Sequence, residues 1–283
     1  MTNTAQPPKR KRSLLQRYAA APHVVWSILF VIAHLIFVVY YAFTDADGAF
    51  TVANVAEFFT PTYLKIFGRS VRMSLIATAI CLVVGYPIAY CISRCKPKTQ
   101  RILTMLLMLP MWMNFLIRTY AIMVLIQDTG IINGFLGNFG IGPFHMLGTE
   151  GAVILGMVYD YLPYMILPIY SVMAKLDHRL VEAAADLGCN GFGVLRKVII
   201  PLTLSGVISG VTMVLVPSIS TFYISQKLGG LDTLMIGDVI EQQYNLNNYN
   251  MTASLSLVLM LILLVGLAIV NRYSDQDEGG MML

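Results

Sequence analysis

Six long stretches of apolar residues constrain the fold of this chain more than any other feature of its sequence. They cover roughly residues 24–43, 70–92, 102–126, 151–173, 199–223 and 251–271. A helix needs about 20 apolar residues to cross the hydrocarbon core of a membrane, and a helix satisfies its own backbone polar groups there. The sequence therefore predicts an all-α membrane protein with six transmembrane helices.

The composition and the missing motifs argue against an enzyme. Only 12% of the 283 residues are charged, whereas a soluble domain carries about 25%. The chain contains no phosphate-binding loop of the type GxxxxGK[ST] and no Ser/His/Asp arrangement, so we expect neither a cofactor nor ATP hydrolysis on this chain. Its four cysteines lack metal-binding spacing, which predicts no metal site and no disulfide framework. They are Cys81, Cys91, Cys95 and Cys189.

Lysine and arginine predict how the chain is oriented in a cell (inner or plasma) membrane. Fourteen of the 19 fall on the side that carries the N-terminus, and loop 127–150 has none. By the positive-inside rule that side is cytoplasmic, and both termini with it. The net charge of +4 then reflects topology and anionic lipid rather than nucleic acid. The fourteen are Lys9, Arg10, Lys11, Arg12, Arg17, Arg94, Lys96, Lys98, Arg101, Lys175, Arg179, Arg196, Lys197 and Arg272.

These features divide the chain into five segments. Residues 1–23 form a basic cytoplasmic segment, and 24–43 form an uncleaved first transmembrane helix. Residues 44–69 form an external loop that can include a short interfacial helix. Residues 70–271 form a core of five transmembrane helices with a cytoplasmic helix at about 176–190, and residues 272–283 form a cytoplasmic tail.

The loop between the fourth and fifth stretches carries a specific motif. Its first part mixes acidic and basic residues with Ala and Leu in helix-forming proportion, and a glycine then supplies a stop signal. The motif resembles the EAA loop of ATP-binding-cassette importer permeases, and its residues are Glu182, Ala183, Ala184, Gly188 and Pro201. In that family the loop is a coupling helix that docks into a cleft on the ATPase subunit. The resemblance implies a type I importer permease fold, and Asp186, one turn after Glu182, offers a second carboxylate to a basic partner.

Further strings resemble the first permease subunit of spermidine/putrescine importers. They are Leu109–Tyr120, Val158–Tyr170, Phe222-Tyr223, Gly229-Gly230 and Ile236-Gly237. The resemblance implies a polyamine substrate, a second permease subunit, an ATPase dimer and an external solute-binding protein. Two alternatives stay open: a permease of the same superfamily for sulfate, molybdate, thiamine or an iron complex, and an ion-coupled secondary transporter. The second alternative is weaker because the sequence has no evident inverted repeat.

Two charged residues, Arg118 and Asp160, fall inside predicted membrane helices, where a charge costs about 3 kcal/mol at the helix centre. Both are expected at a similar depth, so they can form an ion pair that locks the third helix to the fourth. Alternatively, Asp160 binds an ammonium group of the substrate, since ammonium groups favour carboxylates and aromatic faces. The sequence leaves both interpretations open.

Five more residues are candidates for the substrate path. Tyr159 and Tyr164 accompany Asp160 on the fourth helix, and Asn114 shares a helical face with Arg118. Tyr223 ends a polar stretch of the fifth helix, and Trp112 either packs or lines the path. The acidic loop 224–250 is a mouth for cations, a contact for the binding protein, or only a solvated loop.

Overall fold

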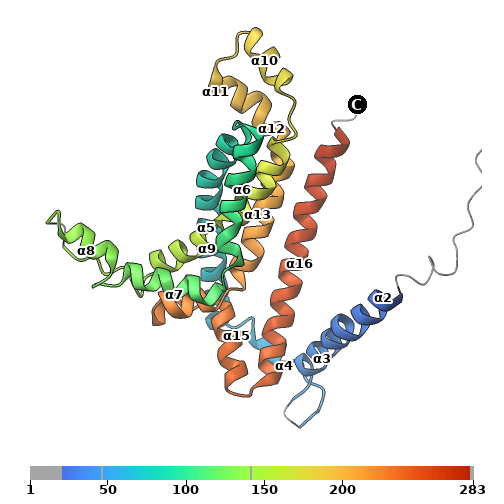
Figure 1. Cartoon of the computed structure of the whole chain (residues 1–283). Coiled ribbons are helices and arrows are strands. Elements are labelled where there is room, and N and C mark those ends of the chain that lie inside the picture. The colour runs from blue at the N-terminus through green and yellow to red at the C-terminus, as the bar shows by residue number, and fades with distance from the viewer. Residues whose placement is uncertain (1–20, 46, 141, 281–283) are drawn as a thin grey trace, which may run out of the picture.

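The computed structural model describes residues 21–45, 47–140 and 142–280, and these residues form helices joined by short connections, with no β-strand among them. The basic residues Lys9–Arg12 and Arg17, and with them most of the predicted segment 1–23, lie outside the described residues. Figure 1 shows a bundle of long helices with a segment projecting from one end and two arms leaving its sides.

The helices follow one another along the chain in four groups. The first arm consists of α2 (Ala21–Ser27), η1 (Ile28–Ile32) and α3 (Ala33–Ala42), and a loop with α4 (Ala53–Glu57) follows. Next come α5 (Pro61–Ser93), α6 (Pro97–Trp112), α7 (Phe115–Ile126), α8 (Ile131–Gly137) and α9 (Glu150–Met173). The third group is α10 (His178–Asp186), α11 (Gly191–Val194), η2 (Leu195–Ile199) and α12 (Ile200–Leu202). The last is α13 (Leu204–Ile219), α14 (Tyr223–Leu228), η3 (Leu231–Thr233), α15 (Ile236–Asn245) and α16 (Tyr249–Gly280).

The main hydrophobic core lies where α5, α9 and α13 pack together. Met73 and Ala77 of α5 belong to this core together with Met157 and Met165 of α9, and all four side chains are fully buried. Between membrane-spanning helices such contacts act through close van der Waals packing, because lipid tails are as apolar as these side chains. These three helices therefore form the rigid part of the molecule on which the other elements are placed.

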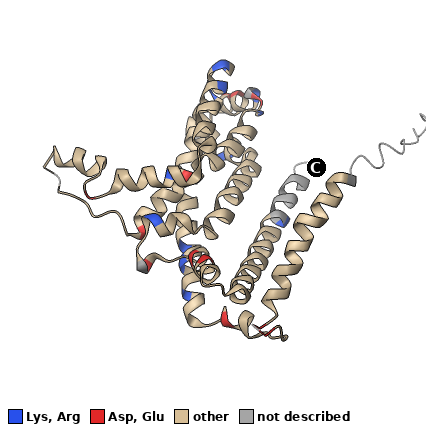
Figure 2. Ribbon diagram, turned by 60° about the horizontal axis from the view of Figure 1, so that its bottom comes forward, with Lys and Arg blue, Asp and Glu red and all other residues tan. Residues whose placement is uncertain are grey.

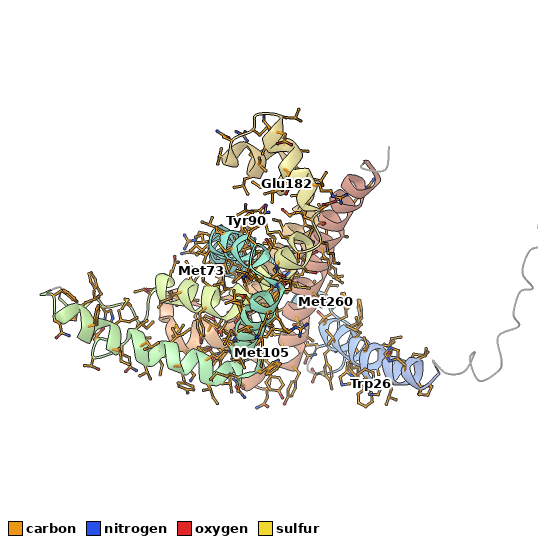
Figure 3. All side chains as sticks on the ribbon, turned by 45° about the horizontal axis from the view of Figure 1, so that its top comes forward. Trp26, Met73, Tyr90, Met105, Glu182 and Met260 are labelled. Atoms are coloured by element: carbon orange, nitrogen blue, oxygen red, sulfur yellow. The ribbon has the colours of Figure 1, made fainter. Side chains whose placement is uncertain are left out.

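The first helical arm is attached mainly through its contact with α16. Asn250 of α16 donates through its side-chain amide to the carbonyl oxygen of Tyr41 (3.3 Å), and Ser254 donates to the carbonyl oxygen of Ala42 (3.0 Å). The rest of α2 and α3 exposes large apolar side chains, including Trp26 and Phe37. Figure 3 shows Trp26 far from the bundle, so this arm needs lipid or another protein to cover it.

Five helical stretches are long and apolar enough to cross a membrane. They are Pro22–Ala42, Pro61–Ser93, Phe115–Gly137, Glu150–Met173 and Tyr249–Val270. A sixth span is formed if the pair Gly191–Leu202 and Leu204–Ile219, bent by 68° at Thr203, is counted as one. The number of spans is thus five or six, and the protein is a helical membrane protein, as the apolar stretches predict.

The third apolar stretch differs from the prediction of one continuous helix over 102–126. Helix α6 ends at Trp112, and α7 begins at Phe115 and runs crosswise to α6 (Figure 1). Two local features favour this break: Pro110 has no backbone N–H to donate, and the side chain of Asn114 accepts a hydrogen bond from the N–H of Leu116 (2.8 Å). The prediction treated this stretch by its hydropathy alone and missed the start signal at Asn114.

Two other boundaries also differ from the sequence prediction. Helix α5 begins at Pro61, nine residues before the predicted start at 70, because Pro61 occupies the first turn, where proline is favoured. Helix α16 continues to Gly280, so most of the predicted tail 272–283 is helical. Within the predicted external loop 44–69 the structure has the five-residue helix α4, and residues 61–69 belong to α5.

Candidate functional site

Two helix breaks and helix α9 enclose a pocket of about 430 Å³. One break separates α6 from α7, and the other separates α13 from α14. Residues of both breaks line the same pocket. We call this cavity the Asp160 pocket. Its lining residues are Met111, Met113, Phe115, Arg118, Asp160, Tyr161, Tyr164, Ser220, Thr221, Phe222 and Tyr223.

The second break is held in place by a close contact with α15. A Cβ atom added to Gly237 would lie 2.5 Å from the carbonyl oxygen of Thr221 and 2.6 Å from that of Ser220, closer than such atoms can approach. Only glycine lets α15 pack this tightly against the broken backbone. Pro217 lies inside α13 just before the break, and Tyr161 donates to the Pro217 carbonyl oxygen at 3.5 Å.

Arg118 of α7 and Asp160 of α9 meet in the wall of this pocket. Nη1 of Arg118 lies 3.3 Å from Oδ1 of Asp160, and the two side chains are only 5% and 0% exposed. Thr119 adds a long hydrogen bond of 3.5 Å to the other carboxylate oxygen. The structure thus brings together the two charges that the sequence placed at a similar depth.

The pairing leaves polar atoms without a full set of partners. Among the described residues, no hydrogen bond reaches Nε or Nη1 of Arg118, or Oδ1 of Asp160. Charged groups in a good salt bridge approach to about 2.7–2.9 Å, so 3.3 Å marks an ion pair with unused hydrogen-bonding capacity. A buried carboxylate in that state can accept another donor, from water or from a bound cation.

Aromatic rings cover the wall of the pocket beside this pair. Tyr161 and Tyr164 lie with ring centroids 6.4 Å apart, and Phe115 and Tyr223 with centroids 6.0 Å apart. The guanidinium carbon of Arg118 lies 5.9 Å from the Phe115 centroid. The ring faces and the carboxylate are groups that attract organic cations, and in this structure the carboxylate is paired with the guanidinium of Arg118.

The predicted path residues divide into two sets. Asp160, Tyr164 and Tyr223 line the pocket. Trp112 is 71% exposed, Tyr159 is 45% exposed, and neither contributes to the lining. Asn114 also lies outside the lining, since its side chain caps α7.

Sequence reasoning missed Phe115 and Phe222 as lining residues, whereas it placed Tyr161 beside Asp160 and Thr221 in the polar stretch of the fifth helix. Phe115 lies one turn before Arg118 on α7, and Tyr161 directly follows Asp160. The start signal at Asn114 was available in the sequence and would have placed Phe115 in the first turn of a new helix. No sequence signal places Thr221 and Phe222 opposite α7, because that contact depends on how α13 and α14 are arranged.

The motif with Glu182 lies in a second region, which we call the projecting segment (residues 177–203). Asp177 caps α10 by accepting a hydrogen bond from the N–H of Arg179 (3.0 Å). Gly188 ends the helix with a φ of +82°, a conformation that glycine adopts without strain. Figure 3 shows Glu182 on this segment, away from the bundle, and Figure 2 shows charges of both signs gathered there.

The outer surface of the projecting segment combines exposed acids with exposed apolar side chains. Glu182, Ala183 and Asp186 are exposed, whereas Ala184 is buried and packs toward the core. Leu187 is 86% exposed and Phe192 is 71% exposed, so both side chains add apolar surface to this segment. Pro201 lies in α12, just before the bend at Thr203, and is also exposed.

Comparison with known proteins identifies relatives over most of the chain. The family described as "Binding-protein-dependent transport system inner membrane component" matches residues 82–276. The spermidine/putrescine transport system permease protein PotB of Haemophilus influenzae is 40% identical over 261 residues, which is 88% of this chain and 91% of that protein. PotB of Escherichia coli is 36% identical, over 89% of this chain and 94% of its own length.

Two solved structures share the fold. A bacterial alginate ABC transporter in complex with an alginate pentasaccharide-bound periplasmic protein matches with a TM-score of 0.76 at 14% identity, over 94% of this chain and 96% of the matched chain. An inward-facing structure of the MetNI methionine ABC transporter matches with a TM-score of 0.59 at 14% identity, over 76% of this chain and 95% of the matched chain. At these identities the likeness concerns the fold alone, which is that of type I ABC importer permeases.

Proposed function

The chain belongs to the family of binding-protein-dependent transport system inner membrane components, and from this premise we propose that it is a permease subunit of an ATP-driven polyamine importer. Its substrate class is spermidine and putrescine. Two PotB relatives at 40% and 36% identity carry that substrate class in their names. Polyamines are flexible chains with ammonium groups, so they require carboxylates and aromatic faces.

The observation that carries the proposal is the incompletely bonded carboxylate of Asp160 in an aromatic pocket. Oδ1 of Asp160 has no hydrogen bond among the described residues, and the lining includes Phe115, Tyr164 and Tyr223. In this conformation Arg118 neutralises Asp160, so an ammonium group has to replace the guanidinium as the partner of the carboxylate. A change of conformation that separates α7 from α9 exposes Asp160 to the substrate in this scheme.

The projecting segment is the proposed contact with the ATPase subunits. Glu182, Ala183, Asp186 and Gly188 present an exposed surface next to the apolar side chain of Leu187. Two carboxylates one turn apart favour a basic partner, and an apolar side chain beside them fits a cleft. When ATP binds, the two ATPase subunits close on each other and move the projecting segment. This movement is transmitted to the helix bundle as a rigid-body tilt.

Three further parts of the proposal concern partners and orientation. A second permease completes the translocation path, and an external solute-binding protein delivers the polyamine to the end that carries α15. The projecting segment and both termini face the cytoplasm, as the distribution of lysine and arginine favours. Lipid covers much of the exposed apolar surface, including that of α2 and α3.

The test is ATP-driven spermidine uptake by the whole transporter reconstituted in proteoliposomes. Asp160→Asn keeps the shape of the side chain and removes its charge, so uptake should fall by roughly tenfold or more, equivalent to about 1.4 kcal/mol or more of lost attraction. Asp128→Asn is the matched control, because Asp128 is an exposed aspartate that pairs with His145 away from the pocket. Uptake by the control should be unchanged.

A double variant separates a role in recognition from a role in folding. Removing one member of a buried ion pair leaves the other charge uncompensated, whereas neutralising both relieves that cost. The variant Arg118→Gln/Asp160→Asn should therefore restore the amount of assembled transporter without restoring uptake. Recovery of both assembly and uptake would reject Asp160 as a substrate-binding residue and leave it a structural one.

A further inference from the structure

A lysine side chain lies against two tyrosine rings next to the Asp160 pocket. The ammonium nitrogen of Lys227 is 5.5 Å from the ring centroid of Tyr120 and 5.6 Å from that of Tyr223. The two rings are 6.2 Å apart and meet edge to face at 74°. A cation within about 6 Å of a ring face is attracted by it, so both rings act on the same ammonium group.

This cluster is continuous with the pocket. Tyr223 belongs to the pocket lining, whereas Lys227 does not. From Tyr223 the row of rings continues to Phe115 at 6.0 Å, and the guanidinium of Arg118 lies 5.9 Å from Phe115. A path of aromatic faces therefore joins the ammonium group of Lys227 to the Arg118–Asp160 pair.

The rings come from two elements that are separate in the sequence. Tyr120 is on α7, and Tyr223 and Lys227 are one turn apart on α14. Helices α7 and α14 pack against each other directly, so the site exists only when these two elements are together. A movement of α7 relative to α14 would open the site and release the lysine.

Lys227 has no acidic partner among the ion pairs found between described residues. Arg118 already neutralises Asp160, so Lys227, Arg118 and Asp160 together carry a formal charge of +1. That arrangement repels a free polycation, even though rings and a carboxylate are the groups that such a cation favours. The ammonium group of Lys227 thus lies where two aromatic rings attract a cation.

We propose that Lys227 is a built-in competitor that occupies the Tyr120–Tyr223 site in the absence of substrate and leaves when a substrate ammonium group enters. This inference rests on the proposed polyamine function. Because the competing ammonium group is part of the chain, its local concentration stays constant while that of the substrate varies. Lys227 therefore sets how strongly a polyamine must bind before it fills the Tyr120–Tyr223 site.

The first test is equilibrium binding of radiolabelled spermidine to the purified complex of permease and ATPase subunits, without the solute-binding protein and without nucleotide. Lys227→Gln removes the competing charge, so the dissociation constant should fall by roughly threefold to tenfold. Lys227→Arg keeps a cation over the rings and should stay near the wild-type value. Lys65→Gln is the matched control, because it removes the same charge at an exposed position of α5 away from the pocket.

The outcomes distinguish this inference from the proposed function. If the wild type binds spermidine and Lys227→Gln binds it no more tightly than Lys65→Gln does, Lys227 is not a competitor and the inference is rejected. If neither the wild type nor Lys227→Gln binds spermidine, the polyamine function itself fails, and the inference fails with it.

A second measurement uses the unaltered chain and does not depend on how a variant folds. The acetylation rate of Lys227 by an amine-reactive reagent should rise several-fold when spermidine is present at saturating concentration, since the released ammonium group becomes accessible. The rate at Lys65 should not change. A rate at Lys227 that stays constant or falls while spermidine is bound contradicts displacement.

Discussion

The Asp160 pocket and the projecting segment are both polar regions of an apolar protein, but they are held in place in different ways. In the pocket, Arg118 and Asp160 come from different helices and are buried against each other. In the projecting segment, Asp177 and Gly188 shape α10 through local contacts, and most of its charged side chains are exposed. Substitutions in the pocket should therefore affect stability, whereas substitutions on the projecting segment should affect association with a partner.

The largest expected effect concerns the buried ion pair. Asp160→Asn leaves the Arg118 guanidinium unpaired in the interior, which should lower the free energy of unfolding by about 3–5 kcal/mol. Glu182→Gln, an equivalent change on the projecting segment, should lower it by less than about 0.5 kcal/mol, since Glu182 is exposed. Thermal unfolding of the purified chain in detergent measures both. If both variants lowered the free energy of unfolding by the same amount, the pocket would be no more sensitive to the loss of a charge than the projecting segment.

The next effect compares two glycines. Gly237→Ala forces a Cβ atom against the carbonyl oxygens of Ser220 and Thr221, so it should destabilise the protein by about 1–3 kcal/mol. Gly191→Ala introduces a Cβ atom with nothing within 4 Å and should be nearly neutral. The midpoint of thermal unfolding distinguishes them. A neutral Gly237→Ala would mean that α15 does not pack tightly on the break.

A smaller effect comes from Asp238, which lies near the start of α15 and outside the membrane-spanning helices. Burial raises the pKa of Asp238 from 3.8 to about 6, although hydrogen bonds from the N–H of Met235 and the hydroxyl of Ser225 oppose the rise. Between these two pKa values the folded chain keeps a proton that the unfolded chain has lost. The free energy of unfolding should therefore decrease by about 1 kcal/mol as the pH rises from 5 to 7.

The variant Asp238→Asn cannot ionise and serves as the control for this pH dependence. Unfolding measured at pH 5, 6 and 7 should show a smaller slope for Asp238→Asn than for the wild type. The same slope in both proteins would assign the pH dependence to another group.

The smallest expected effect on stability belongs to Leu187, on the projecting segment. Leu187→Ser changes a side chain that is 86% exposed, so the free energy of unfolding should change by less than about 0.5 kcal/mol. If this surface docks on an ATPase subunit, co-purification of that subunit should nevertheless decrease markedly. Unchanged co-purification would show that Leu187 does not contribute to the contact with the ATPase subunit. The variant Glu182→Gln tests the acidic part of the same surface in the same assay.

Local sequence patterns predicted the projecting segment in detail. The sequence predicts a helix at about 176–190 with a stop signal at Gly188, and the structure has α10 (His178–Asp186) within that range, because both features depend on residues that are neighbours in the chain. Hydropathy predicted the apolar helices in the same way, because the requirement to satisfy backbone groups in lipid acts on each stretch separately. It failed at residues 113–114, where capping by Asn114 interrupts an otherwise apolar stretch. It also failed for the predicted helix 199–223, which bends by 68° at Thr203 and is interrupted after Ile219.

The sequence by itself determined the class of protein, the positions of most apolar helices and the motif of the projecting segment, because each depends on contacts between residues close together in the chain. Only the tertiary structure decided that two helix breaks face each other, that Tyr223 lines the pocket while Trp112 does not, and that Lys227 lies between rings of α7 and α14. The physical reason is that a pocket is defined by the relative positions of separate helices. The relative positions of the helices depend on close packing at sites such as Gly237. The hydropathy of the sequence does not encode this packing.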